Sequence, residues 1–333
     1  MTELPPLPFI SVIIPTFNRS RMLNETVETI VRQSYPAESR ELILVDNNST
    51  DSTSAAIRDL ARLHPGITGI TERRRGAHFA RNTGALASRG TILYFTDDDM
   101  LADPHMLMRI VEGFVDGANV ASVTGRVLPK WDTEPPRWIL EHCRNALLSL
   151  NDLGESLIVA DDDPGVFSCH QAITRDAFMR AGGFNPDTNA GEFTGDNETG
   201  LNIKVKKLGY RFAYVPLAVT HHIIPASRMT QRYVNSRLAD QGYCDSYTDY
   251  RKLVPGRARL IRRIAAHSGF AARALVTAVA RRAAGKSAWR IDLARAFYHR
   301  NRARYDVRLI RHEEWRRFAM RDDWLDTPQS GDR

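Results

Sequence analysis

Apolar and polar positions along the first hundred residues follow two alternating patterns. Unbroken apolar and β-branched runs at residues 9–17, 42–45 and 91–95 predict strands that are buried on both faces. The segments between them predict helices over residues 22–33, 52–63 and 82–88. Because strand and helix alternate, the pattern predicts a doubly wound α/β sheet.

The remaining chain shows fewer clear elements. They are a helix end with a glycine cap at 178–184, a helix at 198–208, a strand at 211–219 and a helix at 257–285. The last helix is basic, with apolar residues toward one side. We therefore expect an α/β domain over residues 1–250 and a basic helical region over residues 251–333.

Polar turns follow two of the predicted strands. Asp46 begins one turn, and the run Asp97, Asp98 and Asp99 forms the other. Ligands of doubly wound sheets bind at the carboxyl ends of the strands. Three adjacent carboxylates repel one another and a diphosphate, unless a hard divalent cation lies between them. The glycine-rich phosphate loops of dinucleotide-binding and P-loop proteins are missing, which points to carboxylate and metal chemistry instead.

Composition places the chain among soluble globular proteins. Of its 333 residues, 43% are hydrophobic and 26% are charged. Three widely spaced cysteines without a CxxC pair argue against a disulfide scaffold or a zinc module, and fit a reducing compartment. The N-terminal residues do not resemble a signal peptide, and no apolar run reaches the length of a transmembrane helix. We expect a cytoplasmic protein.

Charge is distributed unevenly. Residues 255–333 hold 19 Lys and Arg against 8 Asp and Glu, a net charge of +11, whereas residues 1–254 carry −4. Three interpretations of the basic helix stay open: a helix on an anionic membrane, a helix packed on the α/β domain, and a nucleic-acid site. We favour the membrane, at the inner face of the plasma membrane, and expect no nucleic acid, because no nucleic-acid-binding motif accompanies the charge.

Six sequence blocks occur in an order that resembles a known family. They are SVIIPTFNRSRMLNETVETIVRQSYP, ELILVDNNSTDST, GAHFARNTGALASRGTILYFTDDDM, FMRAGGFNP, GDNETGLNIKVKKLGYRF and VTHHIIP. They resemble family 2 glycosyltransferases, and the resemblance spans about 220 residues from the first block to the last. The resemblance implies a GT-A fold, which is a Rossmann-like doubly wound mixed sheet, and a nucleotide-sugar donor.

The resemblance also implies a set of nucleotide-binding residues. They are Pro15, Thr16, Phe17, Arg19, Asp46, Asn47, Arg81 and Asp97. Many relatives have a second aspartate where this chain has Asn47, so the base stays open. UDP-, GDP- and dTDP-sugars are all candidate donors.

The three aspartates match the DxD motif of the family, which implies a bound Mn²⁺ or Mg²⁺. The sequence leaves the register within Asp97, Asp98 and Asp99 open, and we favour Asp97 and Asp99. His222 resembles the histidine that completes the metal site, with His221 as its competitor.

The resemblance also implies a catalytic base at the start of the helix at 198–208, where the family usually carries Glu-Asp eleven residues before a Gly-Tyr pair. Counting back eleven residues from the Gly-Tyr pair at 209–210 reaches Glu198, with Asp196 as the second candidate. Relatives have Glu-Asp where this chain has Asn197-Glu198. Arg228 and Arg237 resemble basic residues that steady the leaving diphosphate.

The resulting hypothesis is a metal-dependent, inverting glycosyltransferase of the hexosyltransferase type. We expect it to act on a glycan or lipid-linked acceptor in cell-surface polysaccharide synthesis. A catalytically degenerate relative that only binds nucleotide or glycan is the alternative. A nucleotidyltransferase is disfavoured, because PTFNRS lacks the glycine-rich loop of that class. Donor sugar, acceptor and oligomeric state stay open.

Overall fold

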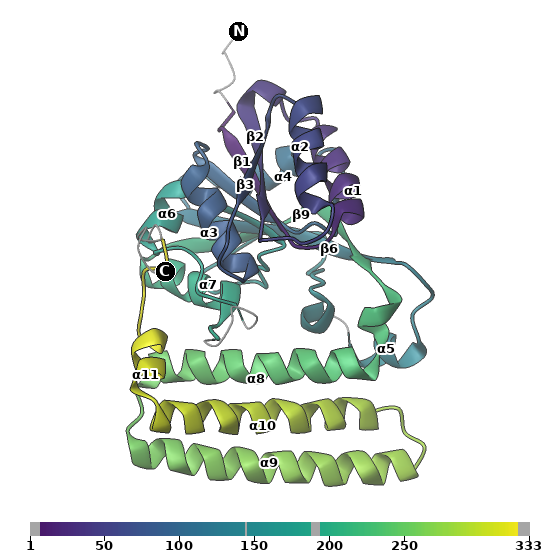
Figure 1. The fold of residues 1–333 in the computed structure, drawn as a ribbon, viewed down its shortest axis with the longest axis vertical. Coiled ribbons are helices and arrows are strands. Elements are labelled where there is room, and N and C mark those ends of the chain that lie inside the picture. Colours follow the sequence, from purple (N-terminus) through teal and green to yellow (C-terminus); the bar gives the residue numbers. More distant parts are fainter. Residues whose placement is uncertain (1–6, 144, 188–193, 326–333) are drawn as a thin grey trace.

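The computed structural model describes residues 7–143, 145–187 and 194–325 (Figure 1). Its strands are β1 (Ile10–Thr16), β2 (Arg40–Asp46), β3 (Ile67–Thr71), β4 (Ile92–Thr96), β5 (Met100–Ala102), β6 (Val120–Trp131), β7 (Ile158–Ala160), β8 (His170–Thr174) and β9 (Arg211–Ile224). Its α-helices are α1 (Ser20–Val31), α2 (Thr53–Leu63), α3 (Ala77–Ala87), α4 (Met106–Val111), α5 (Arg137–His142), α6 (Arg175–Arg180), α7 (Asn197–Lys207), α8 (Gln231–Leu253), α9 (Arg257–Ala283), α10 (Trp289–Arg311) and α11 (Glu313–Ala319). Short 3₁₀ turns are η1 (Ala37–Ser39), η2 (Asn145–Leu148) and η3 (Ala226–Met229).

Within the described part of the chain, nine strands form one mixed sheet. The order is β3-β2-β1-β4-β8-β6-β9-β5, and β7 pairs with β9. β3, β2, β1 and β4 are parallel, whereas β8 runs antiparallel to both β4 and β6. Helices cover both faces, with α1 and α2 on one side and α3 on the other (Figure 1). The predicted doubly wound mixed sheet is confirmed.

Alternation along β1 explains why both faces are covered. Val12 and Ile14 pack in the cluster that contains Leu23 and Val27 of α1, whereas Ile13 packs in the opposite cluster with residues of α3. Every residue of β1 is buried, which accounts for its unbroken apolar sequence. Each fully buried Val, Ile or Leu contributes about 1.5–3 kcal/mol to the free energy of unfolding.

The predicted elements are present, and several differ in extent. The last predicted strand continues to Ile224 as β9, so both histidines of the VTHHIIP block lie in a strand. β3, α8 and α10 were not predicted. The two helices bury tyrosine, alanine and asparagine between polar positions, and such a face gives little apolar periodicity.

α8, α10 and α9 lie side by side in one layer below the sheet, with α10 in the middle (Figure 1). The layer has its own core, which includes Tyr247, Leu260, Tyr305 and Trp315. The predicted boundary at residue 250 falls in the last turn of α8, and the division into two regions stays a prediction. No helix in the described ranges combines the length and the apolar character needed to cross a bilayer.

The chain returns from this helical layer to the α/β part of the molecule. The Trp324 amide donates to the Gly182 carbonyl at 2.9 Å. Gly182 and Gly183 both have φ of +69°, and a Cβ on Gly182 would lie 2.8 Å from the Asp322 carbonyl oxygen. The glycine pair therefore serves both the left-handed turn and the close approach of the returning segment.

His170 is buried at the centre of the sheet. Its Nδ1 lies 2.8 Å from the Tyr94 hydroxyl, and its Nε2 lies 2.9 Å from the Ala218 carbonyl oxygen. Burial lowers the pKa of His170 from 6.5 to about 4, so the neutral ring belongs to the folded state. Its role is structural.

Acid should therefore weaken the fold through His170. Between pH 6.5 and pH 4 the unfolded chain binds a proton here that the folded chain does not, so stability falls as the pH falls. The shift corresponds to about 3 kcal/mol. Urea unfolding at several pH values should give a shallower acid slope for His170→Gln than for the wild type. The exposed control His105→Gln should keep the wild-type slope, and equal slopes for all three proteins would contradict the assignment.

Candidate active site

The polar turns predicted at the strand ends meet at one edge of the sheet. Thr16 at the end of β1 pairs with Asp46 at the end of β2, and β4 lies on the other side of β1. The aspartate run directly follows β4. Parallel pairing thus brings together residues that are about thirty and eighty positions apart in the sequence.

Asp98 points inward and is held by the first strand and its loop. The Thr16 hydroxyl donates to Asp98 at 2.7 Å, and Arg19 Nη1 donates at 2.9 Å to both Asp98 and Asp99. Burial raises the pKa of Asp98 to about 6, although the charge of Arg19 opposes the shift. With its oxygens occupied, Asp98 fixes the turn.

Asp99 and His222 face each other below this turn. Asp99 Oδ1 is buried without a hydrogen-bond partner, and it lies 3.6 Å from His222 Nε2. Asp99 Oδ2 accepts from Arg228 at 2.8 Å and from Arg19. Burial alone would raise the pKa of Asp99, but the interaction with nearby His222, together with the charges of both arginines, lowers it overall.

The free Asp99 oxygen suits Mn²⁺ or Mg²⁺, whereas His222 Nε2 is hydrogen-bonded to Arg228 Nη1 in this structure, so that nitrogen would bind a metal only if Arg228 gave way. Among the residues that the structure describes, no group of three or more His, Cys, Asp and Glu side chains surrounds such a site. The remaining ligands would therefore come from substrate phosphates and water, as is usual for magnesium.

The two neighbouring histidines of β9 point to opposite faces of the sheet. His222 is buried and its Nδ1 lies 2.8 Å from the Leu148 carbonyl oxygen, which orients the ring toward Asp99. His221 instead lies 3.3 Å from Asp103. Only His222 faces the aspartate run.

A chain of contacts links the aspartate run to α7. Arg81 of α3 forms an ion pair with Asp97, and its Nη1 lies 2.9 Å from His78 Nδ1. His78 Nε2 then lies 3.5 Å from Glu198 Oε2. The ring of His78 stacks on Phe184, with centroids 4.8 Å apart. Asp97 is the most exposed of the three aspartates, so this chain joins an open carboxylate to Glu198.

Glu198 and Asp196 have very different surroundings. The Glu198 side chain is 23% exposed, and within the described residues its neighbours at hydrogen-bond range are His78 and Ser168, each at 3.5 Å. Burial acts to raise the pKa of Glu198, but the hydrogen bond and charge of His78 lower it overall, so the carboxylate is ionised at neutral pH. An ionised, partly exposed carboxylate is able to accept a proton.

Asp196 is buried and both of its oxygens are occupied. Asn185 donates to one at 2.7 Å, and Thr248 of α8 donates to the other at 2.8 Å. Asp196 therefore ties the start of α7 to the helical layer. Of the two carboxylates, Glu198 alone has a side chain open to a substrate.

The expected nucleotide-binding residues divide into exposed and internal ones. Phe17 is 49% exposed beside the strand ends, whereas Pro15 is buried within β1. Asp46 accepts from the Ser49 amide at 2.8 Å and also binds the Ser54 hydroxyl. Asp46 lines a cavity of about 300 Å³ between α2 and β3.

Asn47 is occupied by backbone groups. Its amide nitrogen donates to the carbonyls of Glu72 and Arg74 at 3.0 and 2.6 Å, and its oxygen accepts from the Gly76 amide at 2.8 Å. An aspartate could not make the two donations. The asparagine is thus explained by the loop that it holds in front of α3.

The sequence that forms this site matches a known protein family. The family model described as "Glycosyl transferase family 2" matches residues 11–181, which include the aspartate run and both ends of the Arg81 pair. The chain belongs to this family. The predicted family is thereby confirmed.

Relatives of this family 2 glycosyltransferase include two proteins of Haloferax volcanii. Glycosyltransferase AglE is 34% identical over 122 residues, which are 36% of this chain and 40% of that protein. Glucosyl-dolichyl phosphate glucuronosyltransferase is 24% identical over 250 residues, or 72% of this chain and 77% of that protein. The first match therefore spans less than half of the relative's length.

A solved structure shares the fold. It is the mannosyltransferase PcManGT from Pyrobaculum calidifontis in complex with GDP-Man and Mn²⁺, with a TM-score of 0.53 and 26% identity. The match covers 71% of this chain and 62% of that structure. The predicted GT-A fold is confirmed.

His78 was not among the predicted site residues of the glycosyltransferase. It lies three positions before Arg81 in α3, so both side chains occupy the same face of the helix. This spacing from Arg81 was the sequence feature that could have identified His78 as a site residue. Arg237, by contrast, has no contact with the aspartate run among the interactions found in the described residues.

Asn47→Asp should destabilise the glycosyltransferase. The carboxylate would face two carbonyl oxygens without donating to either, at a cost of about 2–4 kcal/mol. Asn48→Asp makes the same chemical change at an exposed neighbour and should alter stability by less than about 0.5 kcal/mol. Thermal unfolding of both variants measures the difference. Equal melting temperatures would show that the loop does not depend on Asn47.

Proposed function

We propose that this family 2 glycosyltransferase transfers a hexose from a nucleoside-diphosphate sugar to a hydroxyl acceptor, with inversion and with a bound Mn²⁺ or Mg²⁺. The main support is the contact chain from Asp97 through Arg81 and His78 to Glu198. It links one ionised and partly exposed carboxylate, through two intervening side chains, to the turn that carries three aspartates. An inverting displacement requires that combination of a base and a donor site.

The reaction is a single displacement. The acceptor oxygen bonds to the anomeric carbon on the face opposite the diphosphate, while the bond from that carbon to the diphosphate oxygen breaks. The proton of the acceptor hydroxyl passes to the Glu198 carboxylate. His78, at 3.5 Å, orients that carboxylate. The nucleoside diphosphate leaves with the electron pair of the broken bond.

The charge that develops on the leaving diphosphate is opposed by groups at the strand ends. Arg228 reaches this region from η3, and Arg19 reaches it from the loop after β1. Asp99 and His222 would hold the metal, which supplies a positive charge against the diphosphate when bound. Asp97 would contact the donor, since it is the most exposed of the three aspartates.

The nucleoside is assigned to the ends of β1 and β2. Exposed Phe17 offers an aromatic face, and Asp46 offers a carboxylate beside the cavity next to α2. The solved relative binds GDP-Man, which supports a nucleoside-diphosphate donor without fixing the base for this chain. Asn47 contributes by holding the loop rather than by reading the base.

We propose a lipid-linked glycan as the acceptor, in the assembly of a cell-surface glycan at the cytoplasmic face of a membrane. The name of one relative, a glucosyl-dolichyl phosphate glucuronosyltransferase, supports a lipid phosphate acceptor. The excess of Lys and Arg after residue 254 supports peripheral contact with an anionic membrane.

Glu198→Gln should lower turnover by about 10²- to 10⁴-fold, because the amide cannot accept the acceptor proton. Its melting temperature and its nucleotide binding should stay close to those of the wild type. Asp196→Asn should instead lower the melting temperature, since Asp196 joins α7 to α8. Initial rates with radiolabelled donor and thermal unfolding separate the two effects. Full turnover in Glu198→Gln would remove Glu198 as the base.

Nucleoside diphosphates should stabilise the fold only in the presence of metal. UDP, GDP, dTDP and CDP, each with and without Mn²⁺, are compared by thermal shift, because a ligand of the native state raises the melting temperature. One diphosphate should raise it strongly with Mn²⁺, and His222→Ala should abolish that increase. His221→Ala is the matched control and should keep it. If no diphosphate acts with Mn²⁺, the donor site is wrong and the non-catalytic glycan-binding alternative is favoured.

A further inference from the structure

The outer helix of the layer exposes an unusual amount of apolar surface. α9 buries only Leu260 and Ala278, although it is 27 residues long, or about 40 Å. Val276, Val279 and Ile261 are 69%, 63% and 57% exposed. Isolated exposed apolar residues are common, but a line of them along one helix indicates a contact surface.

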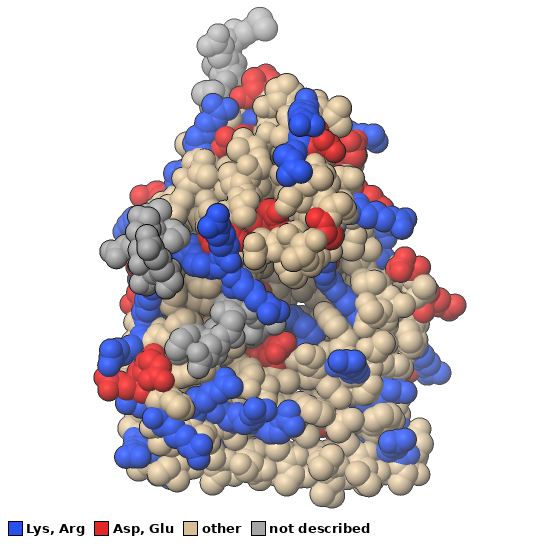
Figure 2. All heavy atoms as spheres, in the orientation of Figure 1, with Lys and Arg blue, Asp and Glu red and all other residues tan. Residues whose placement is uncertain are grey.

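Helical spacing arranges these residues in a stripe. Ile261, Ala265, Ala272, Val276 and Val279 follow one another at intervals of three, four or seven residues, and all are exposed. α9 contains no Asp or Glu. In the face shown in Figure 2, the lower edge of the molecule, where α9 lies, is mostly uncharged, and Lys and Arg side chains gather just above it.

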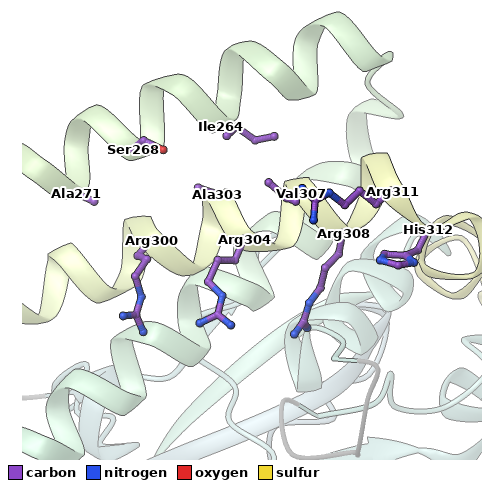
Figure 3. A pocket seen from close by; sticks show the side chains of 10 residues that line it. All are labelled: Ile264, Ser268, Ala271, Arg300, Ala303, Arg304, Val307, Arg308, Arg311 and His312. Atoms are coloured by element: carbon purple, nitrogen blue, oxygen red, sulfur yellow. The ribbon is translucent and has the colours of Figure 1, made fainter.

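A groove runs along one side of the stripe, between α9 and α10. It encloses about 620 Å³ and is lined by Ile264, Ser268 and Ala271 of α9. Figure 3 shows Arg300, Arg304 and Arg308 in a row along α10, with their side chains extending from it on the side away from α9. The groove is lined by four arginines, which are Arg300, Arg304, Arg308 and Arg311. No acidic side chain is among its lining residues.

These arginines lack acidic partners in the described part of the chain. Arg308 lies over the rings of Tyr243 and Trp315, at 5.7 and 4.6 Å, and Arg300 lies over Phe297 at 4.9 Å. Arg304 makes no ion pair or hydrogen bond with any described residue. The basic groups at Arg263 and Arg302 are different, because they are paired with Asp306 and Asp249.

A second basic border lies on the far side of the stripe. Arg259, Arg262 and Arg273 follow the adjacent helical positions and form no ion pair with the residues described. Arginines without acidic partners therefore lie on both sides of the apolar stripe, on α9 itself and across the groove on α10. Arginines placed this way are able to reach phosphates while apolar side chains between them enter the acyl region.

We propose that the outer face of α9 docks on a bilayer of anionic phospholipids, and that the groove beside it binds lipid phosphate groups. This inference rests on the membrane contact in the proposed function and gives it a surface and a binding site. Charge selects the occupant: unpaired arginines face the anionic lipid headgroups, and the stripe between them faces the lipid chains. In a symmetric contact with a second copy, the arginines of one molecule would lie against those of the other, which is unfavourable.

Vesicle sedimentation of the full chain tests the proposal. Vesicles contain phosphatidylglycerol and phosphatidylcholine in equal amounts, or phosphatidylcholine alone. The wild type should bind the anionic vesicles and not the neutral ones. Arg300→Gln combined with Arg304→Gln should lower the partition coefficient by about 10- to 30-fold, since each arginine near an anionic surface contributes about tenfold or less.

Matched controls remove the same groups elsewhere. Arg32→Gln combined with Arg62→Gln removes two arginines whose side chains are 79% and 77% exposed on the catalytic domain, and should change binding little. Val276→Gln combined with Val279→Gln should lower binding about tenfold or more. Leu63→Gln, at a residue 73% exposed, should leave binding unchanged.

Several results would overturn the proposal. Equal losses in the groove variant and in its arginine control would show only a diffuse charge effect. A dimer detected by light scattering, and dissociated by the valine variant, would make a second copy the occupant. Stabilisation by inorganic phosphate without vesicle binding would assign the groove to a soluble anion. Nucleotide binding is measured on the same variants, so the loss of membrane docking is distinguished from failure of the donor site.

Discussion

Three adjacent carboxylates at one strand end are the constraint that shapes this molecule. Each has its own positively charged neighbour: Asp97 binds Arg81, Asp98 binds Arg19, and Asp99 binds Arg228. The arginines come from α3, from the loop after β1 and from η3, so the turn is held from three directions. Removing the charges from one side would leave like charges in contact in a buried turn. The end of β4, the loop after β1, α3 and η3 therefore meet at this turn.

Much of this arrangement was predictable from the order of strands and turns. The aspartate run and Asp46 were expected at the carboxyl ends of parallel strands, and both lie there. The contrast between His221 and His222 depends on one fact that the sequence pattern missed, namely that the strand continues to Ile224. Once the strand is extended, alternation separates the two side chains.

Other features could not be predicted, because their partners are distant backbone groups. Asn47 looked like a departure within a binding motif, yet its amide is used by carbonyls at 72 and 74. Asp196 and Glu198 are two residues apart and chemically alike, and only their surroundings distinguish them. Thr248, which occupies Asp196, belongs to a helix whose polar sequence gave no apolar period. A helix that buries tyrosine and alanine between arginines has no regular apolar period, so its sequence does not predict that it is packed.

The order of the helices α8, α10 and α9 also fixes the distance between the α/β part of the molecule and its outermost helix. Thr248 of α8 donates to Asp196 at the start of α7, so this end of α7 lies directly against the first helix of the layer. Packed helices are about 8–10 Å apart, which puts the axis of α9 roughly 16–20 Å below that of α8. The return of the chain to Gly182 fixes the layer at both ends, so this distance cannot change through a simple hinge. An acceptor anchored in a membrane at the level of α9 would therefore need a spacer of at least that length between its anchor and its reacting hydroxyl. The enzyme would then select acceptors by spacer length as well as by chemistry.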